Sequence, residues 1–518
     1  MHARSLSTEL RRWLPFLAPA LAAVAFGAGA LGHGFVYDDH WTIEHNRWLH
    51  MPLDRLLQGL VGAEWRAPGV LDASRPAMVV STWIDRRLFG SDPFGYRLHS
   101  LLLHGACSVA VAAFAFAVGR RRQVALWAGL FFAVAPVHAE VAAAINYRED
   151  LLATLGTFTA LTVVLWPAAR PHRSTCVLVA TVAWALALLG KESALALLVL
   201  LPVLGVACGG ASFWRRRERT WFALASVLIL WGGWRWALAL RGDGVARAMD
   251  QGVSGRVLAT ARYELWALGQ SLWPVNVAPI HPDPGPAGWG WLLALGGVAL
   301  GTVALMRWRP SRVVGVGLAV ALLAPVVSSP LVGPANEWAD RYLYGAVAGS
   351  SLIFAAGMHA LARRVDRRVV ALLGVLIVGA LGVRRVQAMA PWSDDTTLFT
   401  FAVERAPRSP RAWAALAHAH REAGRANEAL QAAGRALALD PHHAGARLTR
   451  ALVFLSHGDV GAARDEVDHA HRRRPDHPGV RRVRRCLRRD DAEALPCIRG
   501  ERGPVTPAAP AAPREDGE

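Results

Sequence analysis

Lysine and cysteine are the residue types that this chain nearly lacks. Lys191 is the single lysine among 57 basic residues, which indicates a GC-rich, bacterial genome, and only five cysteines occur in 518 residues. The cysteines do not have the spacing of a zinc site, so a zinc-finger protein is excluded. Cys486 and Cys497 lie near each other close to the C-terminus. They form either a disulfide, if this region lies outside the cytoplasm, or two unpaired thiols.

Long apolar runs, by contrast, are abundant. Hydrophobic residues make up 53% of the chain and its mean hydropathy is +0.26, values that favour a polytopic membrane protein. The first run, 13–31, follows Arg11 and Arg12 and lacks a clear cleavage site, so we expect an uncleaved spanning helix. Further runs of spanning length, which bring the expected total to about eleven, lie at 98–118, 123–141, 150–167, 174–190, 193–210, 220–240, 287–306, 311–329, 342–361 and 369–389.

The net charge of +18 would suit a nucleic-acid-binding protein, but the arginines cluster in short segments between the apolar runs. Because this placement follows the positive-inside rule, we assign the charge to membrane topology and expect no nucleic-acid partner. With a cytoplasmic N-terminus, alternation puts the loop 34–97 and the chain after 390 on the periplasmic face of the inner (plasma) membrane. The runs 123–141 and 174–190 are short enough to form re-entrant or interfacial helices instead of spans.

A helical repeat of 34 residues follows Pro391. Residues that recur at this spacing are Ala417 and Ala451, Gly424 and Gly458, Ala429 and Ala463, Ala436 and Ala470, and Pro441 and Pro475. Small residues let two antiparallel helices approach closely, the glycine closes the turn and the proline ends the second helix, as in tetratricopeptide (TPR) repeats.

The predicted fold class is therefore all-α, with three parts. A polytopic membrane helix bundle occupies 1–390 and is followed at 391–498 by a short TPR-type α-solenoid. Its full repeats are 410–443 and 444–477, with partial helices on either side. The tail 499–518 is rich in proline, alanine and acidic residues, so we expect it to be disordered.

Two adjacent carboxylates, Asp38 and Asp39, follow the first span directly. Two carboxylates at a membrane surface are costly to ionise together, so one should titrate above its usual value, which suits a general base. One alternative is a pair of solvated carboxylates at a helix end. Another is a divalent metal site that also uses His40, although three consecutive residues cannot all face one ion. The sequence does not distinguish Asp38 from Asp39 as the base.

Further ionisable residues gather where apolar runs end and begin, which is costly in a membrane unless they line a cavity. They are His99, His138, Glu140, Arg148, Asp150, Lys191, Glu192, Arg341 and its neighbour Tyr342. A guanidinium can donate two parallel hydrogen bonds to phosphate oxygens, so Arg148 and Arg341 are candidates to bind the phosphate of a lipid carrier. The alternative is that these arginines only set the depth of their helices, and for His99 a structural role is the favoured one.

Taken together, these segments resemble the transmembrane and TPR-containing protein O-mannosyltransferases and their bacterial relatives, members of the GT-C class of membrane glycosyltransferases. The similar segments follow the family order over nearly the whole chain, namely Phe35–Asp39, Arg75–Pro76, Gly95–His99 with His104, Pro136–Asp150, Lys191–Glu192, Arg341–Tyr344 and the repeats. The repeat array is shorter than in the animal members of the family.

The resemblance implies an inverting enzyme that moves a sugar, such as mannose, from a polyprenyl-phosphate donor to an acceptor at the non-cytoplasmic face. The acceptor would be a protein serine or threonine, or a glycan, and the repeats would recruit it. The resemblance further implies that Asp38 or Asp39 deprotonates the acceptor hydroxyl. By position and residue type, Arg148, Arg341 and Lys191 are the candidates to stabilise the leaving phosphate.

Two other functions fit parts of the sequence. A non-enzymatic scaffold would use the repeats to bind envelope or glycan-assembly partners, but the ionisable residues on one face exceed what an anchor needs. A lipid or solute transporter would show charges in mid-membrane and related halves, whereas here the charges lie at span boundaries. A membrane glycosyltransferase is therefore the favoured prediction.

Overall fold

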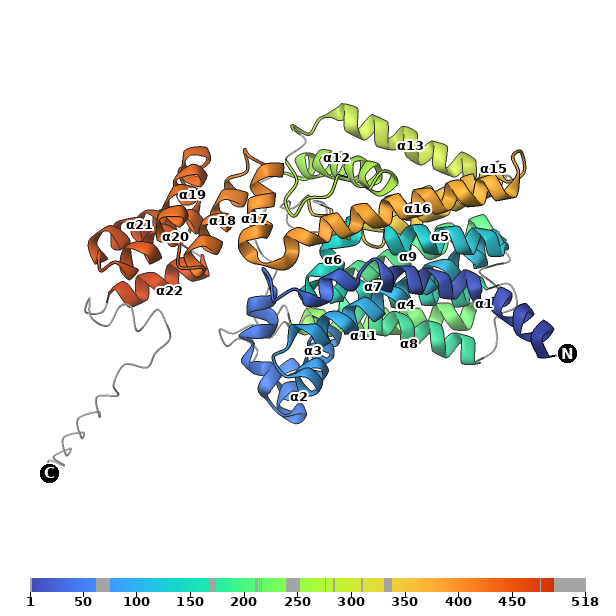
Figure 1. Cartoon of the computed structure of the whole chain (residues 1–518), viewed down its shortest axis with the longest axis horizontal. Coiled ribbons are helices and arrows are strands. Elements are labelled where there is room, and N and C mark those ends of the chain that lie inside the picture. The colour runs from blue at the N-terminus through green and yellow to red at the C-terminus, as the bar shows by residue number, and fades with distance from the viewer. Residues whose placement is uncertain are drawn as a thin grey trace, which may run out of the picture. The chain divides into compact units, whose positions relative to one another are not determined.

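The computed structural model describes residues 2–61, 75–166, 174–209, 213, 215, 217–238, 252–274, 276–282, 285–308, 311–329, 338–475 and 477–488. The regular elements in these ranges are all helical, as the sequence predicts (Figure 1). The chain divides into two compact units, 1–398 and 399–518. The second unit begins eight residues later than the predicted boundary at 391, because the first turn of α17 (Asp395–Arg405) is part of the first unit.

The first unit is a bundle of long helices joined by short helical turns (Figure 1). Its helices are α1 (His2–Ala25), α2 (Leu53–Val61), α3 (Pro76–Phe89), α4 (Pro93–Gly119), α5 (Arg122–Val134), α6 (Ala139–Ala143), α7 (Arg148–Leu165), α8 (Ser174–Gly190), α9 (Ala196–Gly209), α11 (Glu218–Leu238), α12 (Val253–Leu272), α13 (Trp289–Arg307), α14 (Arg312–Leu323), α15 (Val347–Leu361) and α16 (Arg367–Met389). The elements α4, α1, α5 and α7 pack together, and α7 also packs along α8.

Local sequence explains where these helices begin and how closely they approach. Asp92 accepts a hydrogen bond from the main-chain N–H of Phe94 and Pro93 follows it, so α4 has a capped N-terminus with proline in its first turn. Gly156 of α7 faces Ala183 of α8 so closely that an added Cβ would lie 2.2 Å from the Ala183 carbonyl oxygen. Small residues therefore set the distance between α7 and α8, as is common in membrane helix pairs.

Fewer helices than predicted are long and apolar enough to cross a membrane. Within the described ranges four segments qualify, namely Trp13–Gly32, Pro93–Gly119, Trp289–Arg307 and Arg367–Ser393. A fifth span is formed if Arg122–Val134 and Pro136–Ala143, which meet at 51°, are counted as one. The prediction of about eleven spans is therefore not confirmed. Each predicted run does contain a helix, but several are short and α7 begins with Arg148, Glu149 and Asp150, which lowers its hydropathy.

The second unit contains antiparallel helix pairs. After α17 come α18 (Pro410–Glu422), α19 (Ala426–Leu439), α20 (Ala444–Ser456), α21 (Val460–Arg473) and α22 (Pro478–Leu487). Gly424 and Gly458 have φ angles of +73° and +82° in the turns between the paired helices, where a residue without Cβ is favoured. Cys486 is disulfide-bonded. Cys497, which the sequence left either paired with Cys486 or unpaired, and the tail 499–518 lie outside the described residues.

Candidate functional site

Glu149 and Asp150, in the first turn of α7, belong to a network of charged side chains. Lys191, at the end of α8, lies 2.7 Å from Asp150 Oδ2 and 3.0 Å from Glu149 Oε1. Arg75, at the start of α3, pairs with the second oxygen of Glu149 at 2.5 Å and with Glu192 at 3.2 Å. Two cations and three carboxylates from separate segments therefore meet at one place, and four of these five residues lie in segments that the sequence marked as polar.

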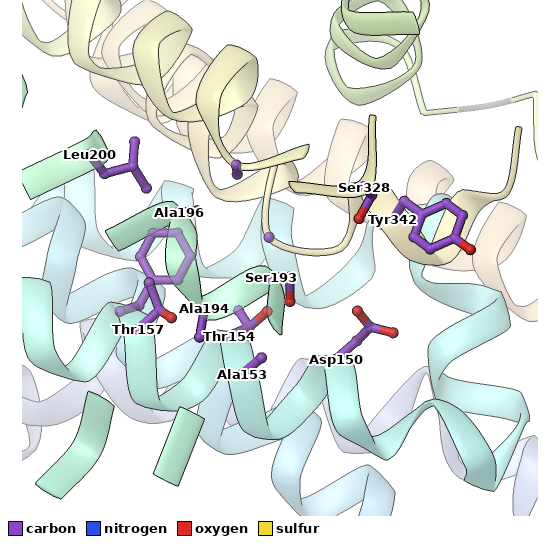
Figure 2. A pocket seen from close by; sticks show the side chains of 13 residues that line it. Asp150, Ala153, Thr154, Thr157, Ser193, Ala194, Ala196, Leu200, Ser328 and Tyr342 are labelled. Carbon is purple, nitrogen blue, oxygen red and sulfur yellow. The ribbon is translucent and has the colours of Figure 1, made fainter. Parts of the chain in front are cut away.

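A pocket opens beside this network, with about 440 Å³ of space that is free of atoms and partly open to solvent. Figure 2 shows Asp150 and Tyr342 at one end of it and Leu200 at the other. Hydroxyl groups line it as well, contributed by Thr154, Thr157, Ser193, Ser328 and Tyr342. The pocket therefore has one polar end and one apolar end.

Arg148 occupies a different environment from the one predicted for a phosphate-binding residue. Its side chain is fully buried, pairs with Asp85 Oδ2 at 2.5 Å, and donates hydrogen bonds to Ser81, Ser100 and the Tyr96 carbonyl oxygen. The second oxygen of Asp85 lies 2.7 Å from Nδ1 of His99. Arg148 and His99 therefore share one buried carboxylate that joins α3, α4 and α7, and Arg148 is enclosed by protein groups.

Glu140 and Arg341 form the next contact. One carboxylate oxygen of Glu140 accepts a 2.7 Å bond from the Arg341 guanidinium, and the other accepts a 2.9 Å bond from the Arg341 main-chain N–H. The guanidinium carbon lies 4.8 Å from the ring centres of both Tyr147 and Tyr342. Arg341 thus contacts two aromatic rings and the Glu140 carboxylate, and the ring of Tyr342 is in turn 5.4 Å from Lys191 Nζ.

The two adjacent aspartates have different environments. Asp39 is fully buried, and its carboxylate accepts hydrogen bonds from the main-chain N–H groups of Asn146 (2.7 Å), Ile145 (3.2 Å) and Val36 (3.4 Å). Burial raises the pKa of Asp39 to about 6, although the charge of Arg97 and these hydrogen bonds act in the opposite direction. Asp38 is only half-buried, and its Oδ2 lies 3.4 Å from the hydroxyl oxygen of Tyr147. Asp39 thus fixes the loop to the start of α7, while Asp38 is the more accessible carboxylate.

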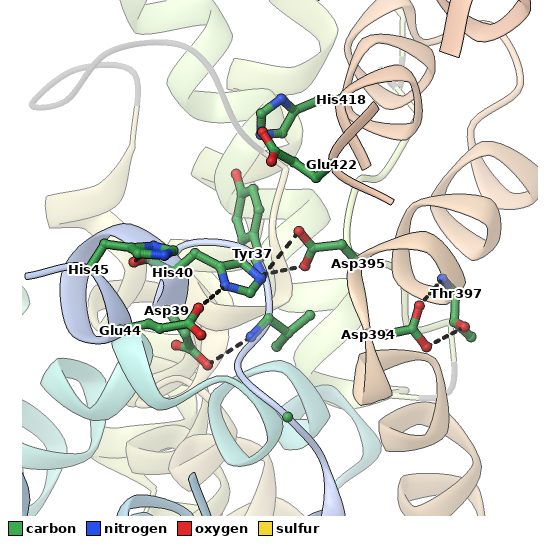
Figure 3. Close-up of polar contacts among 12 residues, drawn as sticks. Tyr37, Asp39, His40, Glu44, His45, Asp394, Asp395, Thr397, His418 and Glu422 are labelled. Atoms are coloured by element: carbon green, nitrogen blue, oxygen red, sulfur yellow. Dashed lines mark hydrogen bonds and ion pairs between the residues drawn. The ribbon is translucent and has the colours of Figure 1, made fainter. Parts of the chain in front are cut away.

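The loop is also fixed at Tyr37, which has a φ of +57°, an uncommon value for a residue with a side chain. Its main-chain N–H donates a 2.6 Å hydrogen bond to Asp395 Oδ1, and Asp395 Oδ2 lies 3.5 Å from Nε2 of His40 (Figure 3). The other ring nitrogen of His40 is 2.5 Å from Glu44. The hydrogen bond with Asp395 is the main reason why the pKa of His40 is raised to about 9, with Glu44 adding to it.

His138 is separate from this group. Its ring is fully buried and packs against Tyr344 at 4.4 Å, Phe132 at 4.5 Å and His104 at 5.5 Å between ring centres. His104 Nδ1 lies 2.6 Å from the Tyr344 hydroxyl oxygen. These contacts give His138 a packing role inside the bundle. Within the described part of the chain, no group of three or more His, Cys, Asp and Glu residues is arranged to hold a metal ion.

The structure brings many of the predicted residues together, in two connected groups. One contains Asp150, Lys191 and Glu192, and the other contains Asp38, Glu140 and Arg341, with Tyr342 between them. Sequence reasoning did not single out Asp85 or Asp395 as site residues. Asp85 lies in an ordinary amphipathic helix and carries no signal, whereas Asp395 could have been noticed as one of two carboxylates directly after the last apolar run.

Comparison with known proteins agrees with the resemblance drawn from the motifs. A tetratricopeptide repeat family model matches residues 420–485. Protein O-mannosyl-transferase TMTC1 of Mus musculus is 32% identical over 154 residues, which are 27% of this chain and 16% of the mouse protein. The Homo sapiens protein of the same name is also 32% identical over 154 residues, and the match covers 17% of it.

The chain thus covers about a sixth of the length of these relatives. No solved structure matches the chain. The sequence matches confirm the similarity to a transmembrane, TPR-containing O-mannosyltransferase family, and they confirm that the C-terminal repeats are of the tetratricopeptide type. With the apolar helices described above, they support a membrane protein.

Proposed function

We propose that this protein is a membrane glycosyltransferase that moves a sugar from a polyprenyl-phosphate donor to an acceptor hydroxyl on the periplasmic face of the inner membrane. The similarity to protein O-mannosyl-transferase TMTC1 supports a glycosyltransferase and makes mannose the first donor sugar to test. The enzyme would be of the GT-C type and would invert the configuration at the anomeric carbon.

The observation that carries this proposal is the position of Asp38 relative to Arg341. The Tyr147 hydroxyl lies 3.4 Å from the Asp38 carboxylate, and the ring of the same tyrosine lies 4.8 Å from the Arg341 guanidinium carbon. A half-buried carboxylate and a cation are therefore separated by about one aromatic side chain. A base and an anion-stabilising group at such a separation can act on the two ends of one glycosyl transfer.

In the proposed reaction Asp38 accepts the proton of the acceptor hydroxyl. The acceptor oxygen attacks the anomeric carbon, a new glycosidic bond forms and the bond from that carbon to the phosphate oxygen breaks, with its electron pair leaving on polyprenyl phosphate. Because the leaving group is already a phosphate anion, it needs charge stabilisation rather than protonation.

The surroundings of the three candidate cations favour Arg341 for this role. Arg148 is fully buried and paired with Asp85, and Lys191 lies within 3.0 Å of two carboxylates. Arg341 pairs with Glu140 and keeps 11% of its side-chain surface exposed, more than either of the other two cations. A phosphate that approaches Arg341 would also lie near Tyr342, at the polar end of the pocket shown in Figure 2.

The acceptor side is supported by the repeats. Tetratricopeptide repeats commonly present a surface for peptide or protein binding, so the acceptor would be a protein serine or threonine, or a glycan, recruited in part by the repeats. The proposal also includes a topology. In it, the chain spans the membrane about eleven times, and loop 34–97 and the repeats lie on the periplasmic side.

The test is transfer of radiolabelled sugar from polyprenyl-phosphate donors by the purified full-length protein in detergent. Asp38→Asn should abolish transfer, because an amide cannot accept the proton. Asp39→Asn should lower the amount of folded protein more than the activity per folded molecule, since Asp39 binds main-chain N–H groups. Asp54→Asn, at an exposed carboxylate in the same loop, is the matched control and should transfer at the wild-type rate. Transfer that survives Asp38→Asn would contradict the proposed base.

A further inference from the structure

The loop that carries Asp38 is held in place by Asp395, which lies near the C-terminal end of the first unit. Asp395 is 358 positions from Tyr37 in the chain, yet its Oδ1 accepts the Tyr37 main-chain N–H at 2.6 Å. Its other oxygen approaches His40 at 3.5 Å (Figure 3). One carboxylate thus contacts the residue before Asp38 and the residue after Asp39.

Asp395 is not occupied in capping its own helix. The neighbouring Asp394 accepts the main-chain N–H of Thr397 at 3.0 Å and its hydroxyl at 2.7 Å, as an N-cap residue does. Figure 3 shows Asp394 turned toward Thr397 and Asp395 turned toward Tyr37 and His40. Asp394 therefore caps the start of the helix, whereas Asp395 binds the loop that carries Asp38.

The conformation of Tyr37 gives this contact its significance. A φ of +57° is unfavourable for a residue with a Cβ, so without an external partner Tyr37 would tend toward a negative φ. Such a rotation would redirect the chain that enters Asp38. On the other side of Asp38, the Asp39 carboxylate is bound by the main-chain N–H groups of Ile145 and Asn146. Asp38 therefore lies between two residues that hydrogen bonds hold in place, Tyr37 and Asp39. Of these two, Tyr37 has the unfavourable backbone conformation.

We infer that Asp395 is a positioning residue that holds Tyr37 in the left-handed conformation and so presents the Asp38 carboxylate to the acceptor. This inference rests on the proposed function for its catalytic meaning. It predicts that Asp395 acts on the turnover step and leaves donor binding, which involves Arg341 and the pocket, nearly unchanged.

Two measurements on the full-length protein in detergent test this role. Asp395→Ala should accelerate hydrogen–deuterium exchange of the segment 35–44, and it should lower kcat about 10- to 100-fold, as expected for a misplaced catalytic group, with a donor KM near the wild-type value. Asp394→Asn is the matched control and should change neither the exchange of this segment nor kcat, because Asp394 bonds within its own helix start.

A double-mutant cycle separates positioning from general destabilisation. Glycine adopts a positive φ without steric cost, so Asp395→Ala should reduce kcat less in a Tyr37→Gly background than in the wild type. Equal losses in both backgrounds, or unchanged exchange in Asp395→Ala, would overturn the inference. If the wild-type protein transfers no sugar from any donor, the proposed function is wrong. The exchange measurement does not depend on transfer and still tests whether Asp395 holds the loop.

Discussion

Glu140 binds Arg341 through both of its carboxylate oxygens, one on the guanidinium and one on the main-chain N–H. The side-chain pair is buried, with 2% and 11% of the two side chains exposed. Breaking such a buried pair by removing one partner is strongly destabilising, because the remaining buried charge loses that counter-charge. Glu140 therefore determines where Arg341 lies as well as how its charge is balanced.

Replacement of Glu140 should separate these two effects. Glu140→Ala should lower the free energy of unfolding by about 3–5 kcal/mol, the usual cost of breaking a buried pair, and should abolish transfer. Glu140→Gln keeps an oxygen for the Arg341 main-chain N–H and should be less destabilising. The unfolding temperature in detergent measures both, with Glu404→Gln at an exposed carboxylate as the control. A Glu140→Ala protein as stable as the control would disprove the structural role.

Lys191 should be needed mainly to neutralise two carboxylates. Lys191→Met removes the cation that lies within 3.0 Å of both Glu149 and Asp150, so we expect a loss of roughly 3–5 kcal/mol of stability. Adding Asp150→Asn removes one of the two negative charges and should restore part of that loss. Unfolding temperatures of the wild type, Lys191→Met, Asp150→Asn and the double variant measure the energetic coupling between Lys191 and Asp150. Additive losses would show that Lys191 and Asp150 act independently.

The sequence located the polar segments but not the partners within them. Charges beside apolar runs are visible in any sequence, and the expectation that they line a cavity led to Asp150, Lys191 and Tyr342, which the structure places at one pocket or directly beside it. Which cation faces which carboxylate depends on how separate helices pack, and no local pattern carries that information. Arg148 shows this, because its partner Asp85 lies 63 positions away in a helix with no distinguishing motif.

The helices themselves were easier to predict than their role in the membrane. The 34-residue repeat fixes the turns at Gly424 and Gly458, and both have the positive φ that the pattern requires. The span count was less predictable, because hydropathy does not reveal where a run such as 123–141 bends. Pro136 lacks the N–H that would continue the helix, so the chain turns by 51° there, and the run forms two helices that count either as one broken span or as a re-entrant segment.

The ion pairs of His40 should make stability depend on pH. The folded-state pKa of about 9 lies above the ordinary value of 6.5, so the stabilisation is fully present below pH 6.5 and is lost as the pH rises through 9. The groups that face the ring are Glu44, Asp395 and the ring of His45. His40→Gln removes the titration, so the wild type should unfold at a higher temperature than this variant at pH 6.5 and at nearly the same temperature at pH 10. A difference that does not change with pH would contradict the assignment.

The turn glycines of the repeats should tolerate no side chain. Gly458→Ala places a Cβ on a residue with a φ of +82° and should cost about 1–2 kcal/mol. Gly434 lies inside α19 with open space around it, so Gly434→Ala should stabilise the repeats by about 0.5–1 kcal/mol. Hydrogen–deuterium exchange of the segment 410–488 in the full-length protein compares the two. The same change in exchange for both variants would show that backbone conformation is not the cause.

The contact between Tyr37 and Asp395 also predicts sidedness. Tyr37 follows the first spanning segment and Asp395 follows the last, so both segments must end on the same side of the membrane for a 2.6 Å hydrogen bond to form. The connection between α15 and α16 precedes the 27-residue segment Arg367–Ser393 and should lie on the opposite side. With loop 34–97 on the periplasmic face, as proposed, a membrane-impermeant maleimide should label Trp41→Cys in sealed right-side-out vesicles and leave Arg364→Cys unlabelled until the vesicles are opened, with the wild type as the background. Equal labelling of both variants in sealed vesicles would mean that Arg367–Ser393 does not cross the membrane.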